Sequence, residues 1–352
     1  MKIELFTTVH YLEIQPRLDG FYLREFLIVQ DYRELGPLLD PDLINALGII
    51  HKNQIENNPV MYLMQYEVDD FVIGGEGDMW TEIISTLLLC FWFIKDNSIS
   101  NAAIFIREVE PNPKIVLRYP NRTYNAKGEI SNTVYNRDEL NSVFMLIPKI
   151  INLRTVSNLD FFEKTGLSDM PMPLDVQYHP ELFTKVYRAL THLETLRETK
   201  HISRKIFHYV AILECLFTRN EPISMEKDIN NCKKNVSNEK EKQFNIAEPV
   251  MEKVQSITSM VRQRVVSYLG GNLKEKKEIA NNITVAYDIR SKYVHGQAIP
   301  GKLMTKTSQI KYALRMDSLV RVIFNKIILT DLEFFLLPED EFESYIKSKI
   351  NP

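Results

Sequence analysis

The chain has 352 residues, with 43 lysine and arginine side chains against 46 aspartate and glutamate side chains, and therefore a net charge of −3. This near balance gives no overall attraction to nucleic acid, and ordinary shares of hydrophobic (45%) and charged (25%) residues exclude a chain that is disordered throughout. The balance hides a division. Residues 1–179 carry 15 basic and 25 acidic side chains, a net of −10, whereas residues 180–352 carry 28 and 21, a net of +7. This asymmetry predicts two units with different partners.

A chain of this length exceeds what one hydrophobic core usually holds, so two domains are expected. We predict the α+β class, with an N-terminal mixed α/β domain over residues 1–160, a linker over 161–179 and an all-α bundle over 180–352. The linker is placed around Met170–Pro173, where alternating methionine and proline disfavour a helix.

In the N-terminal unit, runs of β-branched and aromatic residues at 101–108 and 114–119 predict two neighbouring strands. Residues 61–73 have a similar composition. Residues 79–94 are nearly all apolar and predict one buried helix. That apolar stretch is shorter than the roughly 20 residues that a membrane-spanning helix needs, so no membrane association is expected.

In the second unit, apolar residues recur at intervals of three and four, which is typical of helices. Five helices are predicted, near residues 182–196, 206–217, 249–269, 274–294 and 308–329, with a short acidic helix after Pro338. The fifth is expected to direct Leu314, Val320, Phe324 and Ile328 inward. The polar residues 221–243 predict a poorly ordered excursion between the second and third helices.

The three cysteines are Cys90, Cys215 and Cys232, which form no CxxC pair. So few and so widely spaced cysteines indicate a reducing compartment, and they argue against a disulfide scaffold or a zinc site. The first residues lack the apolar run of a secretory signal. We therefore expect a cytoplasmic protein with no metal and no cofactor.

The most informative stretch is residues 287–296, YDIRSKYVHG, which end the fourth predicted helix. Arg290 and His295 lie five positions apart, and on a continuous helix they would point about 140° apart, since one turn takes 3.6 residues. Gly296 predicts that the helix unwinds directly after His295, which would bring the imidazole back toward Arg290.

An arginine and a histidine together suit phosphodiester chemistry. A guanidinium binds a phosphate and stabilises its transition-state charge, and an imidazole moves protons near neutral pH. RNA provides its own nucleophile, the 2′-hydroxyl, so this chemistry needs no metal. The alternative is structural: Arg290 pairs with an acid, and His295 caps the helix.

Three segments, AILECLF at 211–217, VVSYLGG at 265–271 and YDIRSKYVHG at 287–296, resemble in order and spacing the Apea-like branch of the HEPN superfamily. The resemblance covers roughly residues 180–330. In that family, a bundle of four or five helices ends its motif helix with R-x4–6-H, which Arg290 and His295 match.

The resemblance implies a homodimer with two motifs across one cleft. It also implies a metal-independent endoribonuclease that leaves 2′,3′-cyclic phosphate ends, acting in antiviral defence or as a toxin. By carry-over, Arg290 would bind the scissile phosphate and His295 would transfer the proton. Ser291 departs from the family, since active members often have Asn, Asp or His after the arginine, and some members bind without cutting.

Several other residues are candidates for a supporting role. Glu214 would orient Arg290 or His295 through a salt bridge, or else is a surface acid. Lys292 would contact RNA phosphate, unless it pairs with Asp288 four positions earlier. Tyr293 would stack on a base or, alternatively, pack in the core or at a dimer interface.

A basic cluster starts the motif helix: Lys274, Lys276 and Lys277. These lysines would follow an RNA backbone, or form a solvated face with no ligand.

The leading hypothesis is an endoribonuclease whose acidic N-terminal domain binds a phage-derived or regulatory trigger, or restrains the nuclease. One alternative is a catalytically inactive module on the same fold that binds RNA. Another is a regulatory scaffold, in which the bundle only dimerises and the N-terminal domain binds a protein.

Overall fold

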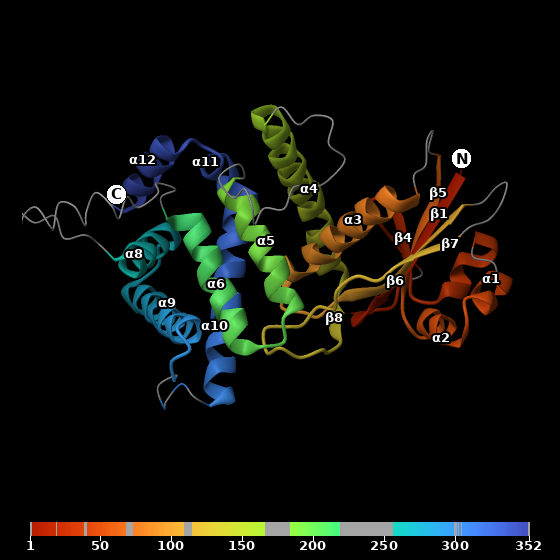
Figure 1. Cartoon of the computed structure of the whole chain (residues 1–352), viewed down its shortest axis with the longest axis horizontal. Helices are drawn as coiled ribbons and strands as arrows, with labels where there is room; N and C mark the ends of the chain where they lie inside the picture. The colour runs from red at the N-terminus through yellow and green to blue at the C-terminus, as the bar shows by residue number, and fades with distance from the viewer. Residues whose placement is uncertain are drawn as a thin grey trace, which may run out of the picture.

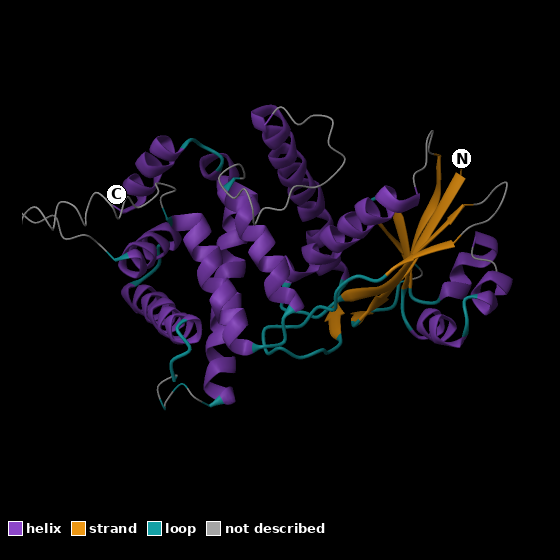
Figure 2. Ribbon diagram, viewed as in Figure 1, coloured by secondary structure: helices purple, strands orange, loops and turns teal. Residues whose placement is uncertain are grey.

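The computed structural model of the chain describes residues 2–18, 20–38, 41–67, 73–108, 115–165, 184–218, 256–298 and 305–350, together with Gly301 and Leu303. The fold is α+β, as predicted. Strands of the N-terminal part form an antiparallel sheet, and helices make up most of the remaining described chain (Figures 1 and 2).

The main sheet has six strands in the order β3-β4-β5-β1-β6-β7, and every neighbouring pair is antiparallel. The strands are β1 (Lys2–His10), β3 (Phe21–Leu23), β4 (Phe26–Val29), β5 (Val60–Glu67), β6 (Ser100–Glu108) and β7 (Ile115–Arg118). A separate parallel pair joins β2 (Leu12–Ile14) to β8 (Thr133–Tyr135). The neighbouring strands β6 and β7 confirm the two that the sequence predicted.

The main sheet is buried on both faces. Alternate residues of β1 point to opposite sides, so that Leu5 joins the core around α3 (Ile73–Ile94) and Phe6 joins a smaller cluster. The smaller cluster is formed with η1 (Tyr32–Leu38), α1 (Pro41–Ala46) and α2 (Ile49–Asn57). The buried helix predicted at 79–94 is confirmed as the later part of α3, which begins earlier, at Ile73.

The N-terminal part ends with a long helix, α4 (Arg137–Thr165), that passes the predicted domain boundary. Residues 161–165, predicted as the start of a linker, belong to this helix, so that edge of the prediction was wrong. The apolar spacing of Ile147, Ile150 and Leu153 packs the middle of this helix on the core. Met170–Pro173 and residues 221–243 lie outside the described residues.

The second part is a helical bundle, and its described residues contain no strand. Its helices are α5 (Lys185–Glu198), α6 (Ile202–Phe217), α8 (Ile257–Leu269), α9 (Leu273–Val294), α10 (Lys306–Lys326), the π-helical turn η3 (Ile327–Asp331), α11 (Leu332–Phe335) and α12 (Glu339–Ile350). The predicted helices are confirmed where they fall on described residues. In the part of the chain that is described, no helix has the length and apolar character needed to cross a membrane.

One predicted core residue of α10 was wrong. Val320, Phe324 and Ile328 are buried as expected, whereas Leu314 is 37% exposed. The buried stripe of α10 runs instead through Ala313 and Met316. Leu314 lies about 100° around the helix from Ala313, which takes it out of the core.

Helix α6 is the central element of the bundle, in contact with α5, α8, α9 and α10 (Figure 1). Its residues from Tyr209 to Leu213 are all buried, so neighbouring elements cover every side of this middle segment. A buried bidentate pair between Arg264 of α8 and Glu343 of α12, at 2.7 and 2.8 Å, holds the C-terminal helix against the bundle.

The sheet and the bundle share one hydrophobic core. A single cluster of buried side chains runs from β1 through α3 and α4 into α5, α6, α9 and α10. At the junction, the buried carboxylate of Asp317 on α10 accepts hydrogen bonds from the Trp92 indole of α3 and the Tyr209 hydroxyl of α6, both at 2.9 Å. The two predicted domains are therefore joined by packing as well as by the chain.

Candidate functional site

The motif helix α9 has well-defined ends. At its start, the Asn272 side chain accepts hydrogen bonds from the backbone N–H groups of Lys274 and Glu275, and the Glu275 carboxylate accepts one from the Asn272 N–H. This reciprocal arrangement is a capping box, which satisfies N–H groups that otherwise have no partner in the first turn.

The other end of α9 is a Schellman motif. The Gln297 N–H donates to the Lys292 carbonyl at 2.9 Å, and the Gly296 N–H donates to the Tyr293 carbonyl at 3.3 Å. Gly296 has a φ of 61°, the left-handed conformation that this motif requires and that glycine adopts without a steric penalty. The glycine thus fixes His295 as the last capping residue, at an exposed end of the bundle.

Arg290 is held against α6 by two contacts. Its Nη2 lies 3.2 Å from Oε2 of Glu214, and its guanidinium carbon lies 5.8 Å from the centre of the Phe207 ring. Phe207 and Glu214 are seven residues apart on α6, so they lie on one face of that helix. The Arg290 side chain stays 34% exposed, which leaves part of the guanidinium accessible to a ligand.

Burial shapes the ionisation of the acid in this pair. It raises the pKa of Glu214 above the usual value, and the positive charge of Arg290 opposes the shift. The hydroxyl of Tyr287, one turn before Arg290, has its pKa raised by burial and further by the charge of Glu214. Tyr287 is therefore a neutral phenol at physiological pH.

Arg290 and His295 have no side-chain interaction with each other in the described residues of one chain, which leaves each with its own surroundings. Among the described residues, no hydrogen bond or ion pair joins their side chains, and the only hydrogen bonds of His295 come from its backbone N–H, which donates to the carbonyls of Ser291 and Tyr293. The expectation that the helix end would bring the imidazole toward Arg290 stays a prediction. The Schellman motif keeps residues 290–294 helical up to the cap. Ser291, within this helical segment, is exposed.

The structure separates the candidate RNA-binding residues into two groups. Lys292 donates to the Gln297 side chain at 2.8 Å instead of pairing with Asp288, and Tyr293 is 46% exposed with its ring 6.3 Å from Phe207. These two lie at the motif end of α9. The cluster Lys274, Lys276 and Lys277 lies at the other end, roughly 25 Å away along a helix that rises 1.5 Å per residue.

Two features of α6 were missed by sequence reasoning. Phe207 contacts both Arg290 and Tyr293, and only its position seven residues before Glu214 would have indicated it. His208, beside it, lies with its Nδ1 3.4 Å from Nδ1 of His192 on α5. Burial lowers the pKa of both histidines, that of His208 to about 4, so the pair is neutral at pH 7.

Comparison with known proteins identifies no relative. The chain matches no protein family, no curated protein and no solved structure. Within the described residues, no three histidine, cysteine or acidic side chains are grouped so that they could hold a metal ion.

Proposed function

We propose that the chain is an endoribonuclease of the HEPN type, in which Arg290 binds the scissile phosphate and His295 transfers protons. The observation that carries the proposal is the placement of both residues at one exposed helix end of an all-α bundle. Arg290 is oriented there by Glu214 and Phe207 and remains partly accessible. These residue types suit phosphate binding and proton transfer.

In the proposed reaction, the 2′-hydroxyl of RNA attacks the adjacent phosphorus and the bond to the 5′ oxygen breaks. His295 accepts the proton of the 2′-hydroxyl, and a second, protonated imidazole delivers a proton to the departing 5′ oxygen. Arg290 stabilises the extra negative charge on the phosphoryl oxygens. The products are a 2′,3′-cyclic phosphate and a 5′-hydroxyl end, and the reaction uses no metal.

A homodimer would complete this site, because one chain offers a single motif histidine and the proposed reaction uses two imidazoles. Tyr293 and Val294 support such a pairing. They are large apolar side chains, 46% and 53% exposed, and they lie within the motif itself. Pairing two chains at this end of α9 would cover them and place two Arg290 and two His295 side chains around one cleft.

We assign the acidic N-terminal part a regulatory role, as the receptor for a phage-derived or regulatory trigger or as a restraint on the nuclease. Its net charge of −10 opposes the +7 of the second half. The core that it shares with the bundle supports this role, since α3 packs on α10 and α10 packs on the motif helix α9, which is a continuous route of contacts from the sheet to the motif.

Cleavage of single-stranded RNA in the presence of EDTA tests the proposal. We expect Arg290→Ala and His295→Ala each to lower the rate by about 100-fold or more, because each removes a group that acts in the transition state. Arg137→Ala and His201→Ala are matched controls at exposed positions outside the motif. Cleavage that survives in both motif variants, or a wild type that is inactive on every RNA tested, contradicts the proposal.

The alternative function is a HEPN module that binds RNA or a protein without cleavage. The ion pair between Glu214 and Arg290 favours it, because a carboxylate 3.2 Å away neutralises part of the charge that a phosphate would contact. This alternative predicts RNA binding that weakens with salt, and no cyclic phosphate product.

A further inference from the structure

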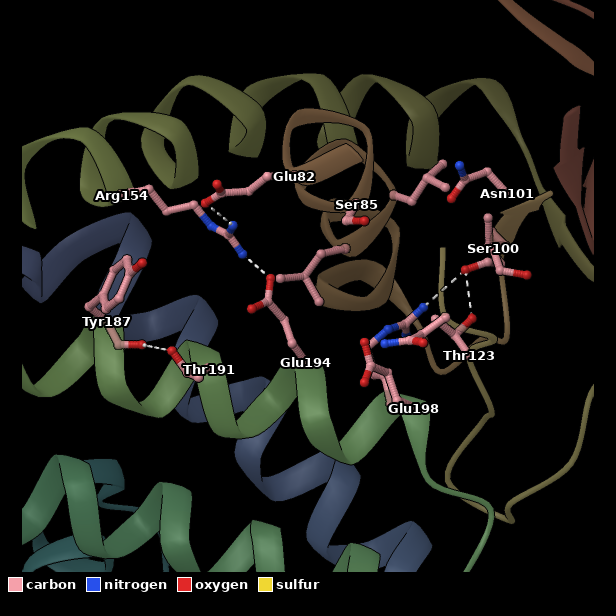
Figure 3. A pocket seen from close by; sticks show the side chains of 15 residues that line it. Glu82, Ser85, Ser100, Asn101, Thr123, Arg154, Tyr187, Thr191, Glu194 and Glu198 are labelled. Carbon is pink, nitrogen blue, oxygen red and sulfur yellow. Dashed lines mark hydrogen bonds and ion pairs between the residues drawn. The ribbon is translucent and has the colours of Figure 1, made fainter. Parts of the chain in front are cut away.

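A cavity of about 510 Å³ lies where the N-terminal part meets the bundle, and none of the residues that line it belongs to α9. Its walls come from α3, the start of β6, residues 121–123, α4 and α5 (Figure 3). A volume of this size is typical of small-molecule sites, and such sites occur preferentially between structural units.

The charges around the cavity disfavour an anionic ligand. Three glutamates and two arginines line it, so the lining has a net charge of −1, and both arginines are already engaged. Arg154 reaches between Glu82 and Glu194, with its Nη1 3.2 Å from Glu82 and its Nη2 in contact with Glu194 (Figure 3). Buried Arg197 donates instead to the carbonyl of Ile99 and to the side chain and carbonyl of Asn97, at 3.0 to 3.3 Å.

The lining is rich in hydrogen-bond acceptors. The hydroxyls of Thr123 and Thr191 donate to backbone carbonyls, at 2.8 and 3.2 Å, so their oxygens keep acceptor capacity for a ligand. The carboxylate of Glu198 is exposed at the rim. A ligand that complements these groups carries several hydroxyl or amino donors.

Part of the cavity lining is apolar. Leu88 and Leu89 of α3 and Ile99 contribute it, whereas Glu194 and Glu198 come from α5. Apolar side chains on one helix and carboxylates on another suit a ligand with one flat hydrophobic face and one edge of hydroxyl groups. A carboxylate that hydrogen-bonds ribose hydroxyls is a recurring arrangement in nucleotide recognition.

We infer that this junction cavity binds an uncharged nucleoside, with the base against the apolar part of the lining and the ribose hydroxyls toward the glutamates. The bound nucleoside contacts α3 and α4 on one side and α5 on the other, and so strengthens the junction between the two parts. This inference does not depend on the proposed nuclease activity.

Titration calorimetry of the full chain with adenosine, guanosine, cytidine and uridine tests it. We expect at least one nucleoside to bind with a Kd below about 1 mM, and its 5′-monophosphate to bind at least tenfold more weakly because of the glutamates. If no nucleoside binds at that level, or if the monophosphate binds equally well, the inference is overturned.

Two variants locate the binding. Ser85→Phe places a ring in the cavity and is expected to weaken nucleoside binding more than tenfold, whereas Ser142→Phe, at an exposed position of α4, leaves it unchanged. Equal loss in both variants, or no loss in Ser85→Phe, places the ligand elsewhere.

Glu194→Gln keeps the test decisive if Ser85→Phe does not fold. It removes one negative charge from the cavity, so the preference for nucleoside over monophosphate is expected to shrink several-fold. Glu341→Gln, the same change on the exposed face of α12, is the control. An unchanged preference in Glu194→Gln overturns the inference.

Discussion

Glu214 determines how much of the Arg290 charge is available at the motif. The two side chains are 3.2 Å apart and both are partly exposed, so their attraction is worth at most about 1 kcal/mol. A phosphate that binds Arg290 must compete with this carboxylate. Glu214 therefore orients the guanidinium, and under the proposed function it would lower the affinity of Arg290 for phosphate.

Replacing Glu214 by glutamine tests this competition. We expect Glu214→Gln to bind a non-cleavable 2′-O-methyl RNA about fivefold more tightly than wild type, because roughly 1 kcal/mol of competing ion pair is removed. Fluorescence anisotropy at fixed salt measures the affinity. Glu278→Gln, an equal charge change near the other end of α9, is the control. An equal gain in both variants would mean that only net charge changed.

At the scale of the element, α9 depends on its two ends. The capping box at Asn272 and the Schellman motif at Gly296 define a helix that carries the motif residues in its last turn. The sequence predicted this helix nearly to the residue, because the glycines before and after it and the apolar spacing are local signals.

We expect Asn272→Ala to lower the free energy of unfolding by about 1 kcal/mol, because the backbone N–H groups of Lys274 and Glu275 lose their acceptor. Chemical denaturation measures the change. Asn281→Ala, at an exposed position within the same helix, should leave stability unchanged or slightly higher. If Asn281→Ala lost as much unfolding free energy, the effect would come from helix propensity and not from the cap.

At the scale of the whole molecule, the junction between the two parts contains buried ionisable groups. Lys205 of α6 is fully buried and donates to the carbonyls of Tyr124 and Leu196, at 3.1 and 2.8 Å. Burial lowers its pKa to about 7, reinforced by the charge of Arg197 and opposed by Asp317 and Asp96. Burial likewise raises the pKa of Asp96 to about 6, with Asp317 adding to the shift.

The lowered pKa of Lys205 makes stability depend on pH. An unfolded chain keeps this proton up to about pH 10, whereas the folded chain releases it near pH 7. Between these values the unfolded state binds more protons, so stability rises with pH.

We therefore expect wild type to gain about 2 kcal/mol of unfolding free energy between pH 7 and pH 9, relative to Lys205→Met over the same range. Denaturation at both pH values measures the difference. Lys200→Met, an exposed lysine nearby, should keep the wild-type slope. An unchanged slope in Lys205→Met would show that Lys205 titrates outside this range.

Local patterns alone determined much of this protein: the α+β class, strands β6 and β7, the bundle helices with the spacing of Arg290 and His295, and the division of charge. Each depends on residues close in sequence, whose period or capping signals act within a few turns. The tertiary structure alone decided the contact of Arg290 with Glu214 and Phe207, the core that joins sheet to bundle, and the junction cavity. These depend on which faces of distant segments pack together. In a helix with a broad apolar surface, such as α6, the spacing of the apolar residues does not tell which other helices pack against it.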